Sequence, residues 1–492
     1  MKRRTFLKSS LISLTGAMLP VKGFGADDDI IWMTLATINS YLYADKSHPG
    51  NPKPAPGELF IPPLIDAQTQ NGLKKFSLKI QEGRHTFFSG TSTQTYGING
   101  NYLGPTLYMR RGEKVSITYT NSLRESTTMH GHGMHVPAAM DGGPHQTIRP
   151  GSKWTTTYTV NQKACTNWYH PHYMGKTAEQ VYKGLAGLIY IEDEESMLLG
   201  LPNQYAVNDI PLVVQDRRFT ANKQLDYSPT TREIRQGYMG NTFLVNGVVS
   251  PYFNAEASLL RLRILNGSNA RVYRFSFSDQ RDFHIIAGDN SFLPAPIRVG
   301  EVRLSPGERV EIVVDLKGDL GNSFSLMDLS SGANLLTLRV NKRANTSASL
   351  PKQLTSTLEF PHFANAVRTR RFDLGMANMH MAINRKTMSL NRIDEFVPLN
   401  ALEIWEVRNT MNMNHNFHIH ATHFIVLERN GSSANVQPHE RAYKDVVFMP
   451  PGSRVKLLVK MTDYRDRNNA YMYHCHILEH EDDGMMGQFV VT

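Results

Sequence analysis

Leu402-Glu403-Ile404-Trp405-Glu406-Val407-Arg408-Asn409 is the third copy of a pattern that defines the fold of this chain. The first two copies are Val115-Ser116-Ile117-Thr118-Tyr119-Thr120-Asn121 and Leu260-Arg261-Leu262-Arg263-Ile264-Leu265-Asn266. Apolar and polar residues alternate in these copies, and each one ends in Asn. Since alternation with a period of two predicts β-strands, and the copies lie roughly 145 residues apart, one all-β unit is used three times.

A second repeated feature follows each of these strands. It is a Pro-Gly turn that leads into another alternating strand, and it occurs at Pro150-Gly151, Pro306-Gly307 and Pro451-Gly452. Gly and Pro turns, short alternating strands and few helical periodicities indicate Greek-key β-sandwiches. The sequence therefore predicts an all-β protein of three consecutive sandwich domains.

The 492 residues suit about three domains of roughly 150 residues each. We expect these domains at residues 58–196, 205–345 and 346–492. A segment rich in Asn, Ser, Ala and Thr, from about residue 341 to 357, is expected to join the second domain to the third. Residues 27–57 form an N-terminal extension without an assigned function.

The N-terminus carries the marks of an export signal. Twin arginines, Arg3 and Arg4, precede Thr5-Phe6-Leu7-Lys8 and an apolar stretch that is too short to span a bilayer. We expect residues 1–26 to be a Tat signal peptide read by the Tat export machinery, and the mature protein to be periplasmic without a membrane span. Much of the formal charge of +9 belongs to this segment, so no basic patch argues for nucleic acid.

The C-terminal run His474-Cys475-His476-Ile477-Leu478-Glu479-His480, followed by Met485, combines thiolate, imidazole and thioether groups. One Cys, two His and a weak axial Met form the ligand set of an electron-transfer copper, because these ligands suit both Cu(I) and Cu(II). The segment from His415 to His420 supplies the missing histidine. Cys165, the other cysteine of the chain, then has no partner and is expected to be a buried free thiol.

Histidines spaced two residues apart form four pairs. Residues i and i+2 of a strand face the same side, so each pair presents two imidazoles together. Eight imidazoles are too many for one copper and suit three. In the last pair Cys475 points away from its two neighbours, toward the separate copper. The pairs are His130 with His132, His170 with His172, His418 with His420, and His474 with His476.

The repeat also predicts where these pairs lie. Copies one and three lead into histidines, whereas copy two continues as Gly267-Ser268-Asn269-Ala270 and has no such pair. We therefore expect the metal cluster between the first and third domains, with the second domain as a spacer and a wall.

These motifs resemble the multicopper oxidase family from about residue 58 to the end of the chain. Within that family the sequence is most similar to bacterial periplasmic copper-efflux oxidases and three-domain laccases. The resemblance implies cupredoxin-like domains, four copper ions, and an oxidase that couples one-electron oxidation of a substrate to four-electron reduction of O₂ to water. The stretches that carry it are Tyr102-Leu103-Gly104-Pro105-Thr106, Thr127-Thr128-Met129-His130-Gly131-His132-Gly133, Asp141-Gly142-Gly143-Pro144, Trp168-Tyr169-His170-Pro171-His172 and the C-terminal run.

The resemblance also implies a role for each ligand. A mononuclear type 1 copper would bind four residues, a type 2 copper two, and each ion of a type 3 pair three. Two carboxylates, Asp141 and Glu481, match residues that relay protons to the cluster. The type 1 ligands are His415, Cys475, His480 and Met485; the type 2 ligands are His130 and His418; the type 3 ligands are His132, His170 and His476 on one ion and His172, His420 and His474 on the other.

Methionines point to cuprous ion as the substrate. Met376, Met381, Met411 and Met413 lie near type 1 ligands in the sequence, and thioethers prefer Cu(I). The family's copper-efflux members use two methionines and two aspartates here and carry a long Met- and His-rich insert, and this chain has neither the aspartates nor the insert. Filling of gaps in the core by methionine is an equal alternative.

Other functions stay open at this point. A laccase acting on phenols or a ferrous ion oxidase would use the same coppers. A cupredoxin scaffold without copper is disfavoured because every expected ligand position is filled, and nitrite reduction is disfavoured because it needs fewer coppers. Gly131 stands where the family usually has Trp, and we expect the missing indole to open space beside the cluster.

Overall fold

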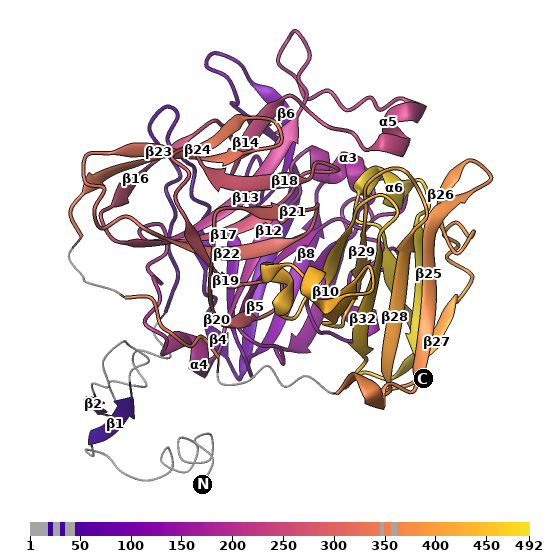
Figure 1. The fold of residues 1–492 in the computed structure, drawn as a ribbon. Coiled ribbons are helices and arrows are strands. Elements are labelled where there is room, and N and C mark those ends of the chain that lie inside the picture. The colour runs from indigo at the N-terminus through magenta and orange to yellow at the C-terminus, as the bar shows by residue number, and fades with distance from the viewer. Residues whose placement is uncertain (1–17, 23–29, 35–44, 345–348, 356–361) are drawn as a thin grey trace.

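The computed structural model describes residues 18–22, 30–34, 45–344, 349–355 and 362–492. Its architecture is three pairs of β-sheets that follow one another along the chain (Figure 1). The predicted all-β class with three consecutive β-sandwiches is thereby confirmed, while the exact domain boundaries stay predictions. Most of the predicted signal peptide, and residues 345–348 and 356–357 of the predicted linker, lie outside the described residues.

The first sandwich packs one sheet of long alternating strands on a sheet whose strands are almost fully buried. The first sheet runs in the order β10 (Lys153–Thr159), β8 (Lys114–Asn121), β5 (Leu73–His85) and β4 (Thr69–Gln70), with β6 (Thr93–Ile98) also beside β5. The second sheet runs β3 (Leu64–Ile65), β7 (Thr106–Arg110), β12 (Gly187–Glu192), β11 (Cys165–His170) and β9 (His130–His132).

The second sandwich lies between the other two in sequence. Its larger sheet runs β15 (Val248–Val249), β14 (Thr242–Val245), β13 (Asp209–Arg217), β17 (Leu259–Asn266), β22 (Arg309–Asp315), β19 (Phe283–Ala287) and β20 (Phe292–Val299). The smaller sheet runs β16 (Tyr252–Glu256), β24 (Ala333–Lys342), β23 (Ser323–Asp328), β18 (Tyr273–Phe277) and β21 (Val302–Leu304).

The third sandwich contains the C-terminal motif. One sheet runs β26 (His380–Ile383), β25 (Arg368–Ala377), β28 (Leu402–Asn409), β32 (Arg454–Lys460) and β30 (Ile425–Arg429). The other runs β27 (Glu395–Val397), β34 (Met486–Val491), β33 (Asp466–His474), β29 (His415–Ile419) and β31 (Val446–Met449).

The repeated strands occupy the same place in each sandwich. Each pairs with a parallel strand on one side and with the antiparallel strand that follows the Pro-Gly turn on the other. Their final asparagines, Asn121, Asn266 and Asn409, each donate through Nδ2 to two or more backbone carbonyls and accept an amide N–H two residues on. Asn recurs because its side-chain amide forms hydrogen bonds with the backbone N–H and C=O groups of the loop that follows the strand.

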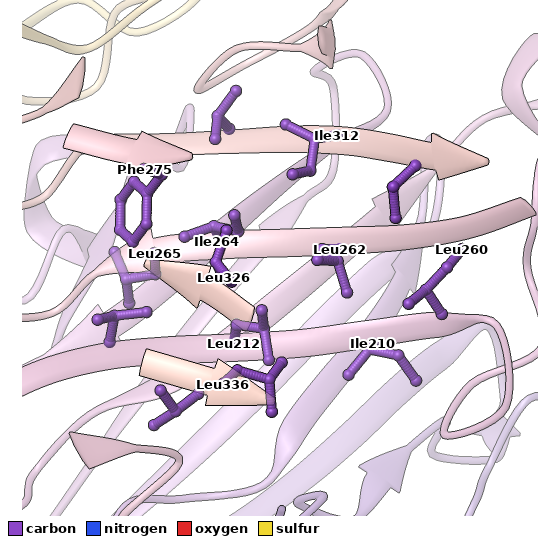
Figure 2. Close-up of a cluster of buried hydrophobic side chains, with 14 of the residues drawn as sticks. Ile210, Leu212, Leu260, Leu262, Ile264, Leu265, Phe275, Ile312, Leu326 and Leu336 are labelled. Carbon is purple, nitrogen blue, oxygen red and sulfur yellow. The ribbon is translucent and has the colours of Figure 1, made fainter. Parts of the chain in front are cut away.

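Apolar side chains fill the space between the sheets. Figure 2 shows this core in the middle sandwich, where Leu262 and Ile264 of β17 meet Ile312 of β22. Full burial of a Leu or Ile side chain stabilises the fold by about 1.5–3 kcal/mol. These cores hold the strands rigidly, so the residues at the strand ends have defined positions.

Helices are short and lie in the connections. They are α3 (Thr177–Tyr182), α4 (Glu194–Met197), α5 (Thr231–Gln236), α6 (Leu478–Asp482), and the 3₁₀ turns η1 (Ala138–Met140), η2 (Phe363–Asn365), η3 (Ser433–Asn435) and η4 (Pro438–Arg441). A separate antiparallel ribbon joins β1 (Met18–Lys22) to β2 (Ile30–Thr34). Within the described residues, none of these helices has the length and apolar character that a membrane crossing requires.

Candidate metal centre

The four histidine pairs meet between the first and third sandwiches. The first sandwich supplies two pairs from β9 and the end of β11, and the third supplies two from β29 and the end of β33. All eight imidazoles are buried. Strand pairing brings them together, since His130 lies opposite His170 in one sheet and His418 lies opposite His474 in the other.

Three of these imidazoles point one nitrogen each at a common centre. Nε2 of His474 lies 3.2 Å from Nε2 of His172 and 3.1 Å from Nε2 of His420. Their mutual spacing suits a shared metal ion. This is the group that the sequence resemblance predicted for one type 3 copper.

A second group forms around His132. Its Nδ1 lies 3.4 Å from Nε2 of His170, and the ring of His476 lies 4.9 and 5.2 Å from these two rings, centre to centre. Both nitrogens of His476 are buried without a hydrogen-bond partner. His130 also lies within ligand distance of His132 and His170, so neighbouring groups of ligands overlap.

His130 and His418 have matching environments. The Nδ1–H of each donates to a backbone carbonyl at 2.8 Å, from Asp141 and Asp445 respectively. The Nε2 of each is buried and unpartnered. A backbone acceptor on Nδ1 fixes the tautomer in which Nε2 is free to bind a metal.

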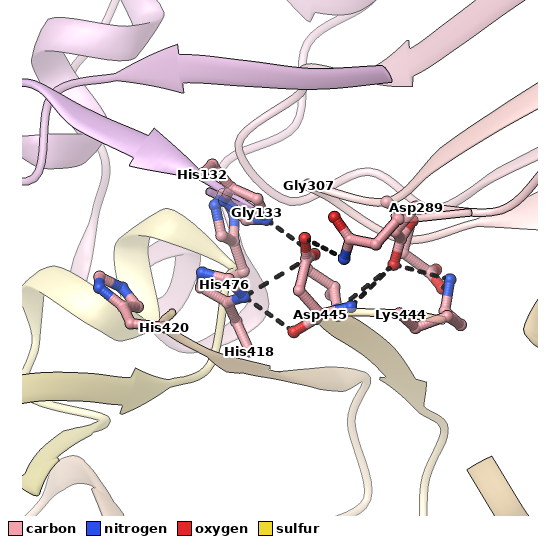
Figure 3. A network of polar contacts seen from close by, with 12 residues as sticks. His132, Gly133, Asp289, Gly307, His418, His420, Lys444, Asp445 and His476 are labelled. Carbon is pink, nitrogen blue, oxygen red and sulfur yellow. Dashed lines mark hydrogen bonds and ion pairs between the residues drawn. The ribbon is translucent and has the colours of Figure 1, made fainter. Parts of the chain in front are cut away.

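Asp445 is a site residue that the sequence reasoning missed. One carboxylate oxygen of Asp445 lies 3.0 Å from Nε2 of His132 and accepts from Arg309 at 2.6 Å, and the other accepts from Arg309 at 2.7 Å (Figure 3). Burial alone would raise the pKa of Asp445, but Arg309 holds it below its usual range. The anionic carboxylate keeps the proton of His132 on Nε2, so Nδ1 faces the cluster.

The middle sandwich contributes residues to the wall of the cluster, as the sequence led us to expect. Arg309 belongs to β22, and its backbone N–H donates to Asp289 at 2.8 Å. Gly307, from the Pro-Gly turn of copy two, packs against His476, since a Cβ at Gly307 would lie 3.1 Å from that ring. Copy two has no histidine pair, so its sequence did not show that Arg309 and Gly307 would be the residues in contact with the cluster.

Burial makes the imidazoles neutral. It lowers the pKa of His130, His172 and His476 to about 3 each, and His480 to about 4. Neutral imidazoles keep a lone pair for a metal ion, whereas protonated ones would repel it.

The two predicted relay carboxylates contact different imidazoles of the same group, the one formed by His172, His420 and His474. Oδ2 of Asp141 is 2.7 Å from Nδ1 of His420, and the oxygens of Glu481 are 3.3 and 3.2 Å from Nδ1 of His172 and His474. Burial raises the pKa of Asp141 well above its usual range. Burial would also raise the pKa of Glu481, but interactions with His172 and His474 hold it below its usual range.

A separate mononuclear group lies at the other end of the C-terminal motif. Nδ1 of His415 and Nδ1 of His480 are 3.0 Å apart, and each is 3.6 Å from Sγ of Cys475. Met485 is buried in the same apolar cluster as Cys475. Burial raises the pKa of the Cys475 thiol to about 12, so the thiolate requires a cation in place of its proton.

The predicted substrate methionines lie in the third sandwich. Met381 is fully buried and pairs with Met376 across the hairpin of β25 and β26. Met376, Met411 and Met413 are half-buried and pack against the apolar cluster that contains Cys475 and Met485. They are close enough to the mononuclear group to share one core with it.

One sequence expectation was wrong. The space beside Gly131 is not open, because a Cβ on Gly131 would lie 3.0 Å from Cγ of Met134. The flexible Met134 side chain fills volume that was expected to be empty. Cys165 is a buried free thiol.

The donor set fits copper. Soft sulfur with two imidazoles suits the mononuclear group, and buried, neutral imidazoles with unpartnered nitrogens suit the larger cluster. Unpartnered buried nitrogens are costly unless a ligand satisfies them.

Comparisons with known proteins agree with this chemistry. Family models described as multicopper oxidase match residues 79–196 and 347–492. A protein named multicopper oxidase mco from Staphylococcus epidermidis is 39% identical over 441 residues, which cover 88% of this chain and 92% of that protein. The cell division protein FtsP of Escherichia coli is 33% identical, with 100% of this chain and 99% of that protein covered.

A solved structure shares the fold. The laccase-like multicopper oxidase CueO from the lignin-degrading bacterium Ochrobactrum sp. superposes with a TM-score of 0.81 at 35% identity, covering 88% of this chain and 100% of that one. The predicted cupredoxin-like sandwiches are therefore confirmed. The chain belongs to the multicopper oxidase family and is a copper-dependent oxidoreductase.

Proposed function

We propose that the chain binds four copper ions in the arrangement that the sequence resemblance implied. The mononuclear type 1 ion would use His415, Cys475, His480 and Met485, and the type 2 ion His130 and His418. The type 3 ions would use His132, His170 and His476, and His172, His420 and His474. The convergence of buried, neutral and unpartnered imidazole nitrogens is the observation that supports this most directly.

Bound copper, cycling between +1 and +2, supplies the single-electron steps that couple oxidation of a substrate to four-electron reduction of O₂ to water. The chain supplies the connection between the two groups of ligands. Cys475 is covalently joined to His474 and His476, and its backbone carbonyl accepts from Nδ1 of His474 at 2.9 Å. Electrons therefore have a short route within one strand end.

Protons reach the cluster through the two buried carboxylates. Asp141 contacts His420 and lies 3.5 Å from Nδ1 of His130, while Glu481 contacts His172 and His474. Water formation consumes protons in a region closed to solvent, so groups at these positions are suited to general acid catalysis.

Cuprous ion is the proposed substrate, with copper tolerance as the biological role. The thioethers of Met376, Met381, Met411 and Met413 beside the mononuclear ligands support a soft cation. Phenols are the alternative, because the Ochrobactrum relative is described as active towards lignin model compounds. Ferrous ion is the third candidate.

The deciding experiment is turnover of the purified, copper-loaded enzyme on Cu(I), Fe(II) and guaiacol in parallel, with O₂ consumption as readout. The proposal expects the largest kcat/KM for Cu(I). A larger value for guaiacol or Fe(II) would reject cuprous ion as the substrate. Copper content, measured on the same sample, tests the expected four ions per chain.

A copper-free scaffold is the competing class of function. One relative, matched over 100% of this chain, is named cell division protein FtsP, and such a role in this chain would need no oxidase activity. A scaffold would purify colourless and without O₂ consumption after copper loading. The filled ligand positions support the enzyme instead.

Periplasmic location through the Tat pathway is also proposed, supported by Arg3 and Arg4 before Thr5-Phe6-Leu7-Lys8. Replacing both arginines with lysine is expected to keep the protein in the cytoplasm, as cell fractionation would show. Export of that variant at the parent level would contradict the assignment.

A further inference from the structure

Both ring nitrogens of His480 are engaged. Nδ1 faces Cys475 and His415, and Nε2 lies 2.9 Å from the backbone oxygen of Arg235. Because Nδ1 faces the mononuclear group, the proton belongs on Nε2, which donates it to that oxygen. A residue of the middle sandwich therefore covers the outer edge of this imidazole.

Arg235 lies in the last turn of α5, which contacts α6, the helix that contains His480 (Figure 1). Glu479 of α6 holds both ends of the covering segment, residues 227–238. It accepts from the hydroxyl of Tyr227 at 3.2 Å and from the backbone N–H of Tyr238 at 3.1 Å. One carboxylate thus positions the whole segment over His480.

Polar contacts rather than apolar burial hold the centre of this segment. A capping box between Thr230 and Glu233 forms the start of α5, and Glu233 pairs with Arg218. None of the residues of α5 is buried. The cover is therefore attached through polar contacts at its ends and at Glu233, and it can be loosened without disturbing a sandwich core.

The other imidazole of the mononuclear group has a different outer edge. Nε2 of His415 is buried and has no hydrogen-bond partner, and Met411 and Met413 precede this residue in the loop after β28. Met411 and Met413 pack against the apolar cluster that contains Cys475 and Met485, and among the described residues no carbonyl accepts a hydrogen bond from Nε2 of His415.

We infer that residues 227–238 form a specificity-determining cover that withholds the edge of His480 from phenols and leaves the methionine side, next to His415, for a small soft cation. The inference rests on the proposed type 1 site and cuprous substrate. A phenol would approach the outer edge of His480, and the Nε2–H that could bind its oxygen there already donates to the carbonyl of Arg235. A bare cation does not need this hydrogen bond.

The test changes the carbonyl without touching a proposed ligand. Gln236→Pro removes a backbone N–H and drives Arg235 out of the helical conformation, which turns its carbonyl away from His480. Gln236→Ala is the matched control, because Gln236 is exposed and Ala maintains the helix. In Gln236→Pro, kcat/KM for guaiacol should rise at least about tenfold, equivalent to about 1.4 kcal/mol.

In both variants kcat/KM for Cu(I) should stay within about twofold of the parent, and the visible thiolate-to-copper band should be unchanged. Tyr227→Phe removes one anchor of the same segment and should raise guaiacol turnover by a smaller factor. It decides the question if Gln236→Pro does not fold.

Unchanged guaiacol turnover in Gln236→Pro and in Tyr227→Phe would overturn the inference. An equal rise for guaiacol and Cu(I) would do the same, since it would indicate an altered type 1 site. If the parent fails to oxidise Cu(I), the proposed substrate is wrong, and the comparison of guaiacol turnover between variants still decides whether the segment is a cover.

Discussion

At the scale of the single residue, the hydrogen-bond partner of one ring nitrogen of an imidazole decides whether the other ring nitrogen is free to bind a metal ion. Backbone carbonyls accept from Nδ1 of His130, His170 and His418, which leaves Nε2 free. His132 is the reverse case, because Asp445 takes its Nε2. Identical residue types therefore present different nitrogens to the cluster, according to the partner behind each ring.

Cys475→Ser is expected to abolish both the visible thiolate-to-copper band and O₂ consumption with every donor. A hydroxyl cannot replace the soft thiolate or its bond path to His474 and His476. Absorption spectroscopy and an oxygen electrode measure the two effects. Cys165→Ser is the matched control, since Cys165 is also a buried free thiol, and it should retain both signals. Retained oxidase activity in Cys475→Ser would refute the proposed electron route.

Asp141→Asn and Glu481→Gln are each expected to slow O₂ reduction by at least about tenfold, because an amide cannot relay protons to the cluster. Copper content and reduction of the type 1 copper by substrate should be unchanged. Stopped-flow reoxidation of the fully reduced enzyme measures the step. Asp463→Asn, at an exposed carboxylate that pairs with His135 outside the cluster, should reoxidise at the parent rate. Reoxidation of either test variant at that same rate would end its relay role.

At the scale of the element, the three Pro-Gly turns have one backbone shape and different surroundings. Gly151, Gly307 and Gly452 all have φ near the left-handed region, at 74°, 83° and 68°. A Cβ would meet no atom within 4 Å at Gly151 or Gly452, but would approach the His476 ring at Gly307. The turn therefore has free space around it in the first and third copies, whereas in the second copy it forms part of the wall of the cluster.

Alanine substitution separates these two roles. Gly151→Ala and Gly452→Ala should each lower the free energy of unfolding by about 1 kcal/mol, from left-handed strain alone. Gly307→Ala should lower it further and also reduce copper content and O₂ reduction, because His476 has to move. Denaturant titration and metal analysis measure these effects. Equal behaviour of the three variants would show that the contact with His476 has no consequence.

The loop after β28 carries the substrate prediction. Replacing Met411 and Met413 together with Leu keeps bulk and apolarity while removing both sulfurs, so folding should be little affected. Cuprous oxidation should fall at least about tenfold while guaiacol oxidation is nearly unchanged. Steady-state kinetics measure both, and Met388→Leu, in a separate apolar cluster, is the control. Equal losses for both donors would mean a perturbed type 1 copper.

At the scale of the whole molecule, buried charges join the sandwiches. Arg263 of β17 pairs with Asp209 and with Glu192 of β12, and Glu311 of β22 accepts from Thr166 of β11 and from Arg261. These ion pairs lie in the junction between the first and second sandwiches. Loss of one partner leaves a buried charge without its counterion, which is strongly destabilising.

Glu311 gives this junction a pH dependence. Burial alone would raise the pKa of Glu311, but Arg261 and Arg263 hold it below its usual range of about 4.3. A lowered folded pKa stabilises the protein above the unfolded pKa, and this contribution is lost as pH falls through the folded pKa. The free energy of unfolding should therefore decrease below about pH 5.

Glu311→Gln should lower the free energy of unfolding by about 3–5 kcal/mol at neutral pH and weaken its decrease in acid. Denaturation midpoints at neutral and acidic pH measure this. Glu301→Gln, an exposed partner of Arg274 in the same sandwich, should change stability by less than about 1 kcal/mol. An unchanged acid dependence in Glu311→Gln would remove this role.

Local sequence patterns are enough to predict the sandwich fold, its threefold use and the candidate ligands. Strand alternation is a local property, and the repeat of the Asn-ended strand can be seen without knowing the fold. The i and i+2 spacing of His474 and His476 places both on one face in any extended segment. Such information is readable along the chain because it depends on neighbours a few residues apart.

The groups behind and around those ligands follow only from the tertiary structure. Asp445 and Arg309 are 136 residues apart, and neither belongs to a spaced motif. Arg235 covers His480 from another sandwich, and Met134 fills the space beside Gly131. These contacts depend on how sheets from different domains pack, and side-chain partners across such junctions leave no periodic signal in a single sequence.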